Sequence, residues 1–256
     1  MLGLFAVQLR TRNAGIADAG WAFCMVWMAA FFAGWEWFHP GAGTESAGSG
    51  GIGGIANWRV LLIGAMGVIW AGRLGLFILF NRVLGRSEDT RYAGIRKERG
   101  AGANRFFLGW FLAQIPFSML FGVCFLAAMR GSGPWIPALV LFIIAVGGEL
   151  LADAQLAAFR ADPKNRGTTC RRGLWRYSRH PNYFFEWLHW FTYVILAWGG
   201  GWWLAVSCIG PALMLFMLFR VSGIPLTEKK SLESRGDDYR EYQRTTSVFV
   251  PWPPKK

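Results

Sequence analysis

The sequence is poor in charged residues, cysteine and histidine. Charged types make up 16% of its 256 residues and hydrophobic types 54%, which excludes a disordered chain and argues against a soluble globule. The four cysteines form no Cys-x-x-Cys pair, so neither a disulfide framework nor a zinc site is suggested. Three histidines are few for a metal enzyme, and we assign no metal. This composition is typical of a membrane protein.

Long apolar runs dominate the chain. About 20 apolar residues cross a bilayer as a helix, and six runs of about that length lie at 17–38, 60–81, 106–129, 134–159, 183–199 and 201–219. The last two are too long together for one crossing and meet at three consecutive glycines, 199–201, so we expect two helices. The sequence therefore predicts an all-α, polytopic integral membrane protein with about six transmembrane helices. We expect a single membrane domain over 1–256, with residues 220–256 as a cytosolic helical tail.

Positive charge is concentrated between these runs. The net charge is +12, and 22 of the 27 Lys and Arg residues lie in three segments, with seven in 82–105, seven in 160–182 and eight in 220–256. Six crossings place these segments on one side of the membrane, together with the N-terminus. This is the positive-inside pattern, which predicts that both termini are cytosolic. Because topology explains the charge, we expect membrane lipid as a partner and no nucleic acid.

Polar side chains inside apolar runs are the clearest functional signal. A charge within a span costs about 2.5–3.5 kcal/mol on insertion, so such groups usually point into the protein. Glu149 and Asp153 are four residues apart and share one helical face. They could be structural pairs between helices, or they could line a pocket for an anionic ligand that enters from the arginine-rich side. The polar positions in or at the ends of the runs are Glu36, Arg73, Asn81, Glu149, Asp153, Arg160, Asn182 and Glu186.

Three motifs resemble those of a known family. Residues 173–183, GLWRYSRHPNY, are followed by Glu186 and resemble the signature of membrane steroid 5α-reductases, sterol Δ14-reductases and their bacterial relatives of unassigned substrate. Residues 228–251 look like the C-terminal signature of the bacterial branch, and residues 88–92 are similar to a third motif of that branch. The Arg-His-Pro-x-Tyr core is also similar to one in integral-membrane methyltransferases that bind S-adenosylmethionine.

The resemblance implies a membrane oxidoreductase that acts on CH-CH groups. It would take NADPH from the cytosolic side and reduce a carbon–carbon double bond in a steroid-like or other lipid substrate held between the helices. A bacterial inner membrane is the location it favours. Carried over position by position, the cofactor contacts are Arg73, Asn81, Asp153, Arg160, Trp175, Arg179, His180, Asn182, Glu186, Glu228 and Tyr239.

The expected catalytic group departs from the family pattern. In the steroid 5α-reductases, a Gln-Glu pair and a Tyr on the next helix polarise the substrate ketone. The matching positions here are Trp35-Glu36 and Trp70, so only Glu36 is retained as the candidate catalytic acid. An indole cannot release a proton as a phenol does, which leaves the proton donor open.

Two other functions remain as alternatives to the reductase. One is an integral-membrane methyltransferase that uses S-adenosylmethionine, on the strength of the shared Arg-His-Pro-x-Tyr core. The other is a non-enzymatic transporter, which would also use buried acids. Transporters usually show duplicated halves with interrupted helices, and no such duplication is visible in this sequence.

Overall fold

The protein is helical throughout the part of the chain that the structure describes. This computed structural model describes residues 1–39, 55–221 and 223–255; it is 81% helical, and no strand occurs among those residues. Five helical stretches within the described ranges are long and apolar enough to cross a membrane: Ile16–Phe38, Trp58–Val83, Thr90–Met129, Trp135–Ala161 and Trp202–Arg235. The expectation of an all-α polytopic membrane protein is confirmed.

The expected span at 183–199 is not among these five stretches. It corresponds to α7 (Pro181–Ala197), which has 17 residues and a length of about 25 Å, less than the roughly 30 Å of a hydrocarbon core. Beyond Ala197 the chain leaves the helix at Gly199 and Gly201, both with positive φ, and the next helix begins at Trp202. The two apolar runs are therefore separate helices, as the glycines predicted.

The chain divides into two compact units. Unit 1 comprises Met1–Gly133 and Ala197–Ser207, and unit 2 comprises Pro134–Leu196 and Cys208–Lys256. The expectation that both belong to a single membrane domain stays a prediction.

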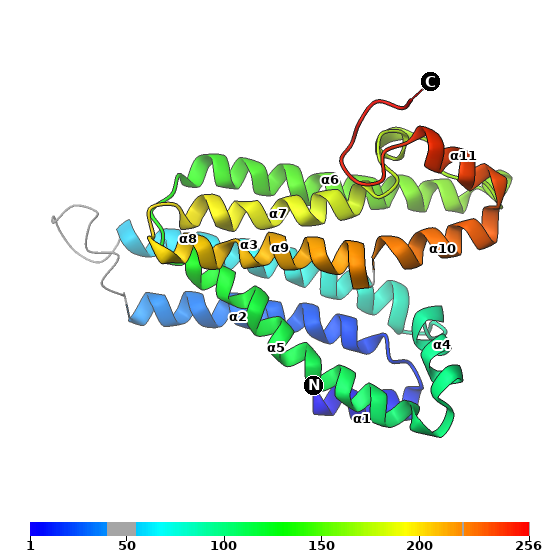
Figure 1. The fold of residues 1–256 in the computed structure, drawn as a ribbon. Helices are drawn as coiled ribbons and strands as arrows, with labels where there is room; N and C mark the ends of the chain where they lie inside the picture. The colour runs from blue at the N-terminus through cyan, green and yellow to red at the C-terminus, as the bar shows by residue number, and fades with distance from the viewer. Residues whose placement is uncertain (40–54, 222, 256) are drawn as a thin grey trace. The chain divides into compact units, whose positions relative to one another are not determined.

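In unit 1, small residues line the contact between α2 (Ile16–Phe38) and α3 (Ile55–Ile78), which pack side by side (Figure 1). A Cβ atom on Gly64 would lie 2.6 Å from the Ala33 Cβ, and one on Gly67 would lie 2.7 Å from the Ala29 Cβ. Glycine therefore lets the two backbones approach closely, as is common between membrane helices. The elements of unit 1 are α1 (Leu2–Thr11), α2 (Ile16–Phe38), α3 (Ile55–Ile78), the π-helical turn η2 (Leu79–Val83), α4 (Thr90–Arg99), η3 (Gly100–Gly102), α5 (Ala103–Met129) and α8 (Trp202–Ser207).

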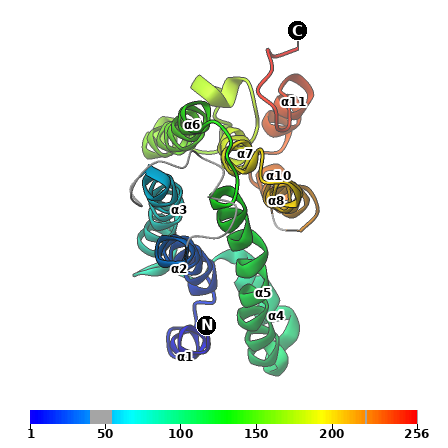
Figure 2. The same cartoon turned by 90° about the vertical axis from the view of Figure 1, so that its left-hand side faces the viewer.

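Unit 2 is built around α7, which lies between α6 and α10 when the helices are seen end-on (Figure 2). Gly148 on α6 packs against the Phe185 ring on α7, and the Trp187 Nε1–H donates a 3.1 Å hydrogen bond to the Pro211 carbonyl. The elements of unit 2 are α6 (Trp135–Ala161), η4 (Pro163–Asn165), η5 (Gly173–Arg176), α7, α9 (Ile209–Phe216), the π-helical turn η6 (Met217–Val221), α10 (Ile224–Arg235) and α11 (Asp237–Thr245).

The expected helical tail consists of α10 and α11, separated by Gly236 at φ +54°. After α11 the chain runs without helix through residues 246–255, here called the C-terminal segment. This segment is fastened to the loop before α7, because Arg179 N–H donates to the Ser247 carbonyl at 2.8 Å and Trp252 N–H donates to the Tyr177 carbonyl at 2.9 Å. The tail of the chain thus lies against the Arg-His-Pro motif.

Candidate functional site

A hydrogen bond between two predicted site residues joins α6 and α7. Pro181 begins α7, and Asn182 follows it in the first turn, where its side-chain Oδ1 accepts a 3.0 Å hydrogen bond from Tyr183 N–H. The Asn182 Nδ2 donates to Asp153 Oδ1 at 3.1 Å. The amide is therefore oriented from both ends, and a carboxylate and an amide, which are chemically able to hydrogen-bond hydroxyl or carboxamide groups, lie next to each other.

A second cluster gathers around the carboxylate of Glu228 on α10. Its Oε1 lies 3.0 Å from Arg179 Nε and 3.2 Å from His180 Nε2, and its Oε2 accepts a 2.8 Å hydrogen bond from Gln243 on α11. The His180 ring is buried and stacks on the Tyr183 ring at 5.3 Å between centroids. Three predicted residues are thus brought together with Gln243, which sequence reasoning missed because nothing in a polar tail distinguishes it.

The loop that carries Arg179 and His180 is anchored to α6. Trp175 is buried, and its Nε1–H donates to the Ala152 carbonyl at 2.8 Å, while Leu174 N–H donates to Gln155 Oε1 at the same distance. Trp175 therefore contacts the residue next to Asp153. The predicted role of Trp175 at a cofactor stays a prediction, but the hydrogen bond of its indole attaches the loop to α6.

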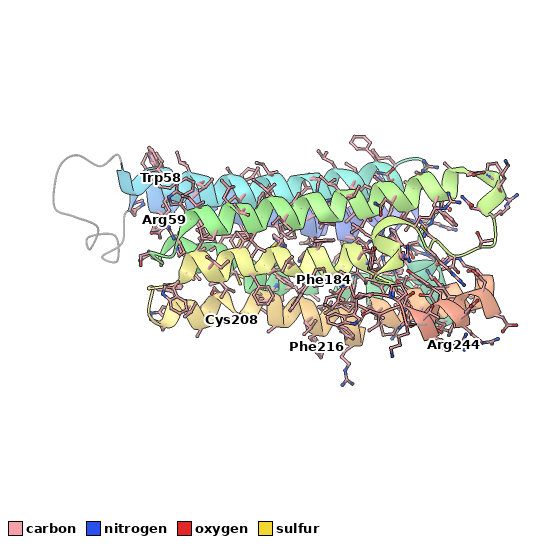
Figure 3. All side chains as sticks on the ribbon, turned by 90° about the horizontal axis from the view of Figure 1, so that it is seen from above. Trp58, Arg59, Phe184, Cys208, Phe216 and Arg244 are labelled. Carbon is pink, nitrogen blue, oxygen red and sulfur yellow. The ribbon has the colours of Figure 1, made fainter. Side chains whose placement is uncertain are left out.

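Tyr242 on α11 holds the same loop from the other side. Its buried hydroxyl donates to the carbonyls of Trp175 and Ser178, the second at 3.0 Å. Ser178 Oγ in turn donates to the Phe249 carbonyl at 2.7 Å and accepts from His180 N–H at 3.1 Å. Figure 3 shows the side chains crowded at this α10–α11 end of unit 2, where Arg244 is labelled. The loop that carries Arg179 and His180 is therefore hydrogen-bonded to α6 on one side and to α11 and the C-terminal segment on the other.

Burial changes the acidity of two tyrosines on α11. The pKa of Tyr239 is raised to about 12, first by burial and then by the negative charge of Glu228. Burial is also the main cause that raises the pKa of Tyr242. Both phenols are hence neutral hydrogen-bonding groups at ordinary pH, and Tyr239, a predicted site residue, lies within reach of the Glu228 charge.

Three further polar positions of unit 2, Glu149, Arg160 and Glu186, differ in burial. Glu186 is buried on α7, one turn beyond Asn182, and Glu149 is buried on α6, one turn before Asp153. Arg160 lies exposed near the end of α6. The face shared by Glu149 and Asp153 is therefore turned inward, whereas the continuation of that face to Arg160 is open to the surroundings.

Arg73 and Asn81 belong to unit 1. Arg73 is half-buried on α3, and Asn81 is exposed in the π-helical turn, where its Nδ2 donates to the Phe77 carbonyl at 3.0 Å. The prediction that these two residues share a site with residues of unit 2 stays a prediction.

Glu36, the candidate catalytic acid, forms an ion pair that the sequence did not reveal. It is 2% exposed near the end of α2, and its Oε1 lies 2.6 Å from Arg130 Nη2 at the end of α5. The Arg130 guanidinium also lies 5.9 Å from the centroid of the Trp203 ring on α8. The available signal was that Arg59 and Arg130 are the only basic residues in the predicted non-cytosolic loops. Trp70 is fully buried, edge-on to Trp21 at 6.3 Å.

Among the described residues, no group of three or more His, Cys, Asp or Glu side chains is placed to hold a metal ion. The chemistry that this part of the chain offers is hydrogen bonding and charge: a carboxylate–amide pair, an Arg–His–Glu cluster and buried phenols.

Comparison with known proteins identifies the family of this chain. Neither a curated protein nor a solved structure matches the chain. One family model matches residues 4–246, nearly the whole length, and its description is "Protein of unknown function (DUF1295)". The chain therefore belongs to the DUF1295 family.

Proposed function

We propose that this protein is a membrane-embedded, NADPH-dependent reductase of a carbon–carbon double bond in a steroid-like or other lipid. The observation that carries the proposal is the Asp153–Asn182 hydrogen bond beside an anchored Arg-His motif, all within unit 2. The DUF1295 family is associated with steroid 5α-reductase-like proteins, which supports the same reaction class.

The residues present suit a phosphorylated dinucleotide. A guanidinium carries five N–H donors in a planar fork. Arg179 pairs with Glu228 through Nε, so we assign its two Nη atoms to the bidentate phosphate contacts. The amide of Asn182 and the carboxylate of Asp153 match the carboxamide and hydroxyl groups of such a cofactor. In this proposal Glu228 positions Arg179 and His180, and Gln243 positions Glu228.

Bound NADPH would supply a hydride to one carbon of the double bond, and the neighbouring carbon would take up a proton. The chain's part is to bind and orient the cofactor, to exclude water and to deliver that proton. We keep Glu36 as the residue that governs turnover. Because its carboxylate is paired with Arg130 at 2.6 Å, proton donation from Glu36 requires the pair to open.

The proposed orientation places both termini in the cytosol of a bacterium, with the protein in the inner membrane. The support is the 22 positive residues in three segments on one side. The five long apolar stretches alone would put the termini on opposite sides, so the proposal requires that α7 also crosses. A fluorescent protein fused to either end should fluoresce, because it folds in the cytosol; fluorescence from only one fusion would contradict the crossing by α7.

The test of the reductase is ligand-dependent stability of the protein purified in detergent. NADPH should raise the melting temperature of the wild type, and Arg179→Gln should weaken this effect. Arg172→Gln, which changes an exposed arginine of the same loop, is the matched control and should behave as the wild type. Stabilisation by S-adenosylmethionine but not by NADPH would favour a methyltransferase, and solute flux in proteoliposomes without a redox cofactor would favour a transporter.

A further inference from the structure

Polar residues continue along one face of α7 beyond the Asp153–Asn182 pair. Glu186, His189, Thr192 and Tyr193 follow Asn182 at helical spacing, so all five lie on one side of the helix. The last three are 1%, 0% and 0% exposed. Thr192 lies ten residues beyond Asn182, about 15 Å along the helix axis. A stripe of hydrogen-bonding groups thus runs into the apolar part of unit 2.

The His189 ring has a defined orientation. Its Nδ1 lies 2.9 Å from the Glu186 carbonyl oxygen, which only accepts, so Nδ1 carries a hydrogen. In the neutral ring Nε2 is then the hydrogen-bond acceptor. The ring stands edge-on to Tyr193, with 5.6 Å between centroids and 89° between planes. A phenol and an imidazole nitrogen with an assigned role are therefore adjacent on this face.

The Thr192 hydroxyl is the unusual member of the stripe. Its Oγ1 is buried and has no hydrogen-bond partner among the described residues. Three other threonines donate from helices to a carbonyl four residues earlier: Thr11 to Val7, Thr227 to Gly223 and Thr245 to Glu241. A buried hydroxyl without a partner is unfavourable, and each such group calls for an explanation. A ligand oxygen or hydroxyl would supply the missing partner.

We propose that Thr192, His189 and Tyr193 bind the polar oxygen of a lipid, a ketone or a hydroxyl, whose apolar body lies among the membrane helices. The proposal deepens the proposed function, on which it rests for the class of substrate. The hydroxyls of Thr192 and Tyr193 can donate to a ketone oxygen, and His189 Nε2 can accept from an alcohol. Hydrocarbon lacking the oxygen would leave Thr192 without a partner.

The probes are three saturated steroids that differ only at carbon 3: 5α-cholestan-3-one, 5α-cholestan-3β-ol and 5α-cholestane. For the full-length protein in detergent, the ketone or the alcohol should raise the melting temperature, and cholestane should not. Thr192→Val preserves the shape and removes only the hydroxyl. We expect it to raise the melting temperature of the ligand-free protein by about 2–4 °C, because an unsatisfied group is removed. The same variant should bind the oxygenated probe at least tenfold more weakly.

Two other variants keep the test decisive if Thr192→Val does not fold. Tyr193→Phe removes one more hydroxyl from the stripe and should also weaken binding of the oxygenated sterol. Thr11→Val, which removes a hydroxyl of α1 that already has a partner, should leave binding unchanged. The inference is overturned if the wild type does not distinguish the oxygenated sterols from cholestane, or if Thr192→Val binds them as the wild type does.

NADPH binding, measured separately, distinguishes this inference from the proposed function. If NADPH stabilises the protein while Thr192→Val retains full sterol binding, the reductase proposal stands and the α7 site is wrong. If NADPH has no effect but Thr192→Val loses sterol binding, the α7 site stands as a lipid site and the reductase proposal is wrong.

Discussion

Asn182 on α7 donates a hydrogen bond of 3.1 Å to Asp153 on α6, a residue 29 positions earlier in the chain. The neighbouring carbonyl, that of Ala152, accepts a hydrogen bond from the Trp175 indole. One turn of α6 therefore accepts hydrogen bonds both from the first turn of α7 and from the loop that precedes α7. The position of the Arg-His motif depends on this turn.

Asp153→Asn should weaken NADPH binding. The substitution keeps the size of the side chain but removes the charged acceptor, and a hydrogen bond to a charged group contributes about 1.5–3 kcal/mol, or roughly tenfold to a hundredfold in affinity. The dissociation constant can be measured from the fluorescence of NADPH with protein in detergent. Asp237→Asn, which changes an exposed aspartate on α11, should have no effect. Equal affinity in Asp153→Asn and wild type would contradict the cofactor assignment.

Glu228→Gln should loosen the tail of the protein. The variant loses its charge interactions with Arg179 and His180, which are largely buried, and we expect destabilisation by about 2 kcal/mol. Amide hydrogen exchange should become faster in α11 and in the C-terminal segment. Glu233→Gln, an exposed change on the same helix, serves as control. Unchanged exchange would show that Glu228 does not hold the tail.

Gly148→Ala and Gly147→Ala form a matched pair on α6. A Cβ on Gly148 would lie 2.5 Å from ring carbons of Phe185, whereas a Cβ on Gly147 would meet nothing within 4 Å. Gly148→Ala should therefore push α7 away from α6 and lower stability by about 1–3 kcal/mol. Gly147→Ala should be neutral or stabilising by up to about 1 kcal/mol, because alanine favours the helix. Thermal unfolding of both variants checks the difference, and equal melting temperatures would contradict the close packing.

Tyr242→Phe should destabilise the motif loop. The change leaves the Trp175 and Ser178 carbonyls without the buried hydroxyl that they share, at a cost of about 1–3 kcal/mol. The melting temperature should fall by about 2–4 °C for each kcal/mol. Tyr177→Phe removes a hydroxyl from an exposed residue in the loop itself and should have little effect. A Tyr242→Phe variant as stable as Tyr177→Phe would show that this hydroxyl does not hold the loop.

Stability should fall above pH 10 because of Tyr239. Its pKa is about 12 in the folded protein against 10.0 for an ordinary tyrosine, so the unfolded chain loses the proton first. The contribution of Tyr239 is complete below pH 10 and is lost as pH rises to about 12. Melting curves between pH 8 and 11 should decline less steeply for Tyr239→Phe than for the wild type. Parallel declines would place Tyr239 in a solvated environment.

Most long helices follow from the apolar runs. The first and last residues of the runs 17–38, 106–129 and 134–159 lie within three residues of the corresponding ends of α2, α5 and α6. The run 201–219 is less regular, since it is divided into α8, α9 and a π-helical turn. Hydropathy reports how much of a segment is apolar, but breaks of a helix depend on the backbone conformation of single residues such as the glycines before α8.

The site was only partly predictable. Spacing placed Glu149 and Asp153 on one face, and the resemblance pointed to Arg179 and His180. The partners of these residues, such as Gln243 for Glu228, lie on segments distant in sequence, and no local pattern specifies which distant side chains meet.

The amino-acid sequence by itself determined that the protein is an all-α membrane protein, because the cost of apolar surface in water and of charge in lipid acts on each segment independently. Only the tertiary structure decided that Asn182 bonds Asp153, that Glu36 pairs with Arg130 and that Thr192 is buried without a partner among the described residues. These relationships depend on the relative rotation and height of packed helices, which arise from the summed contacts of each compact unit.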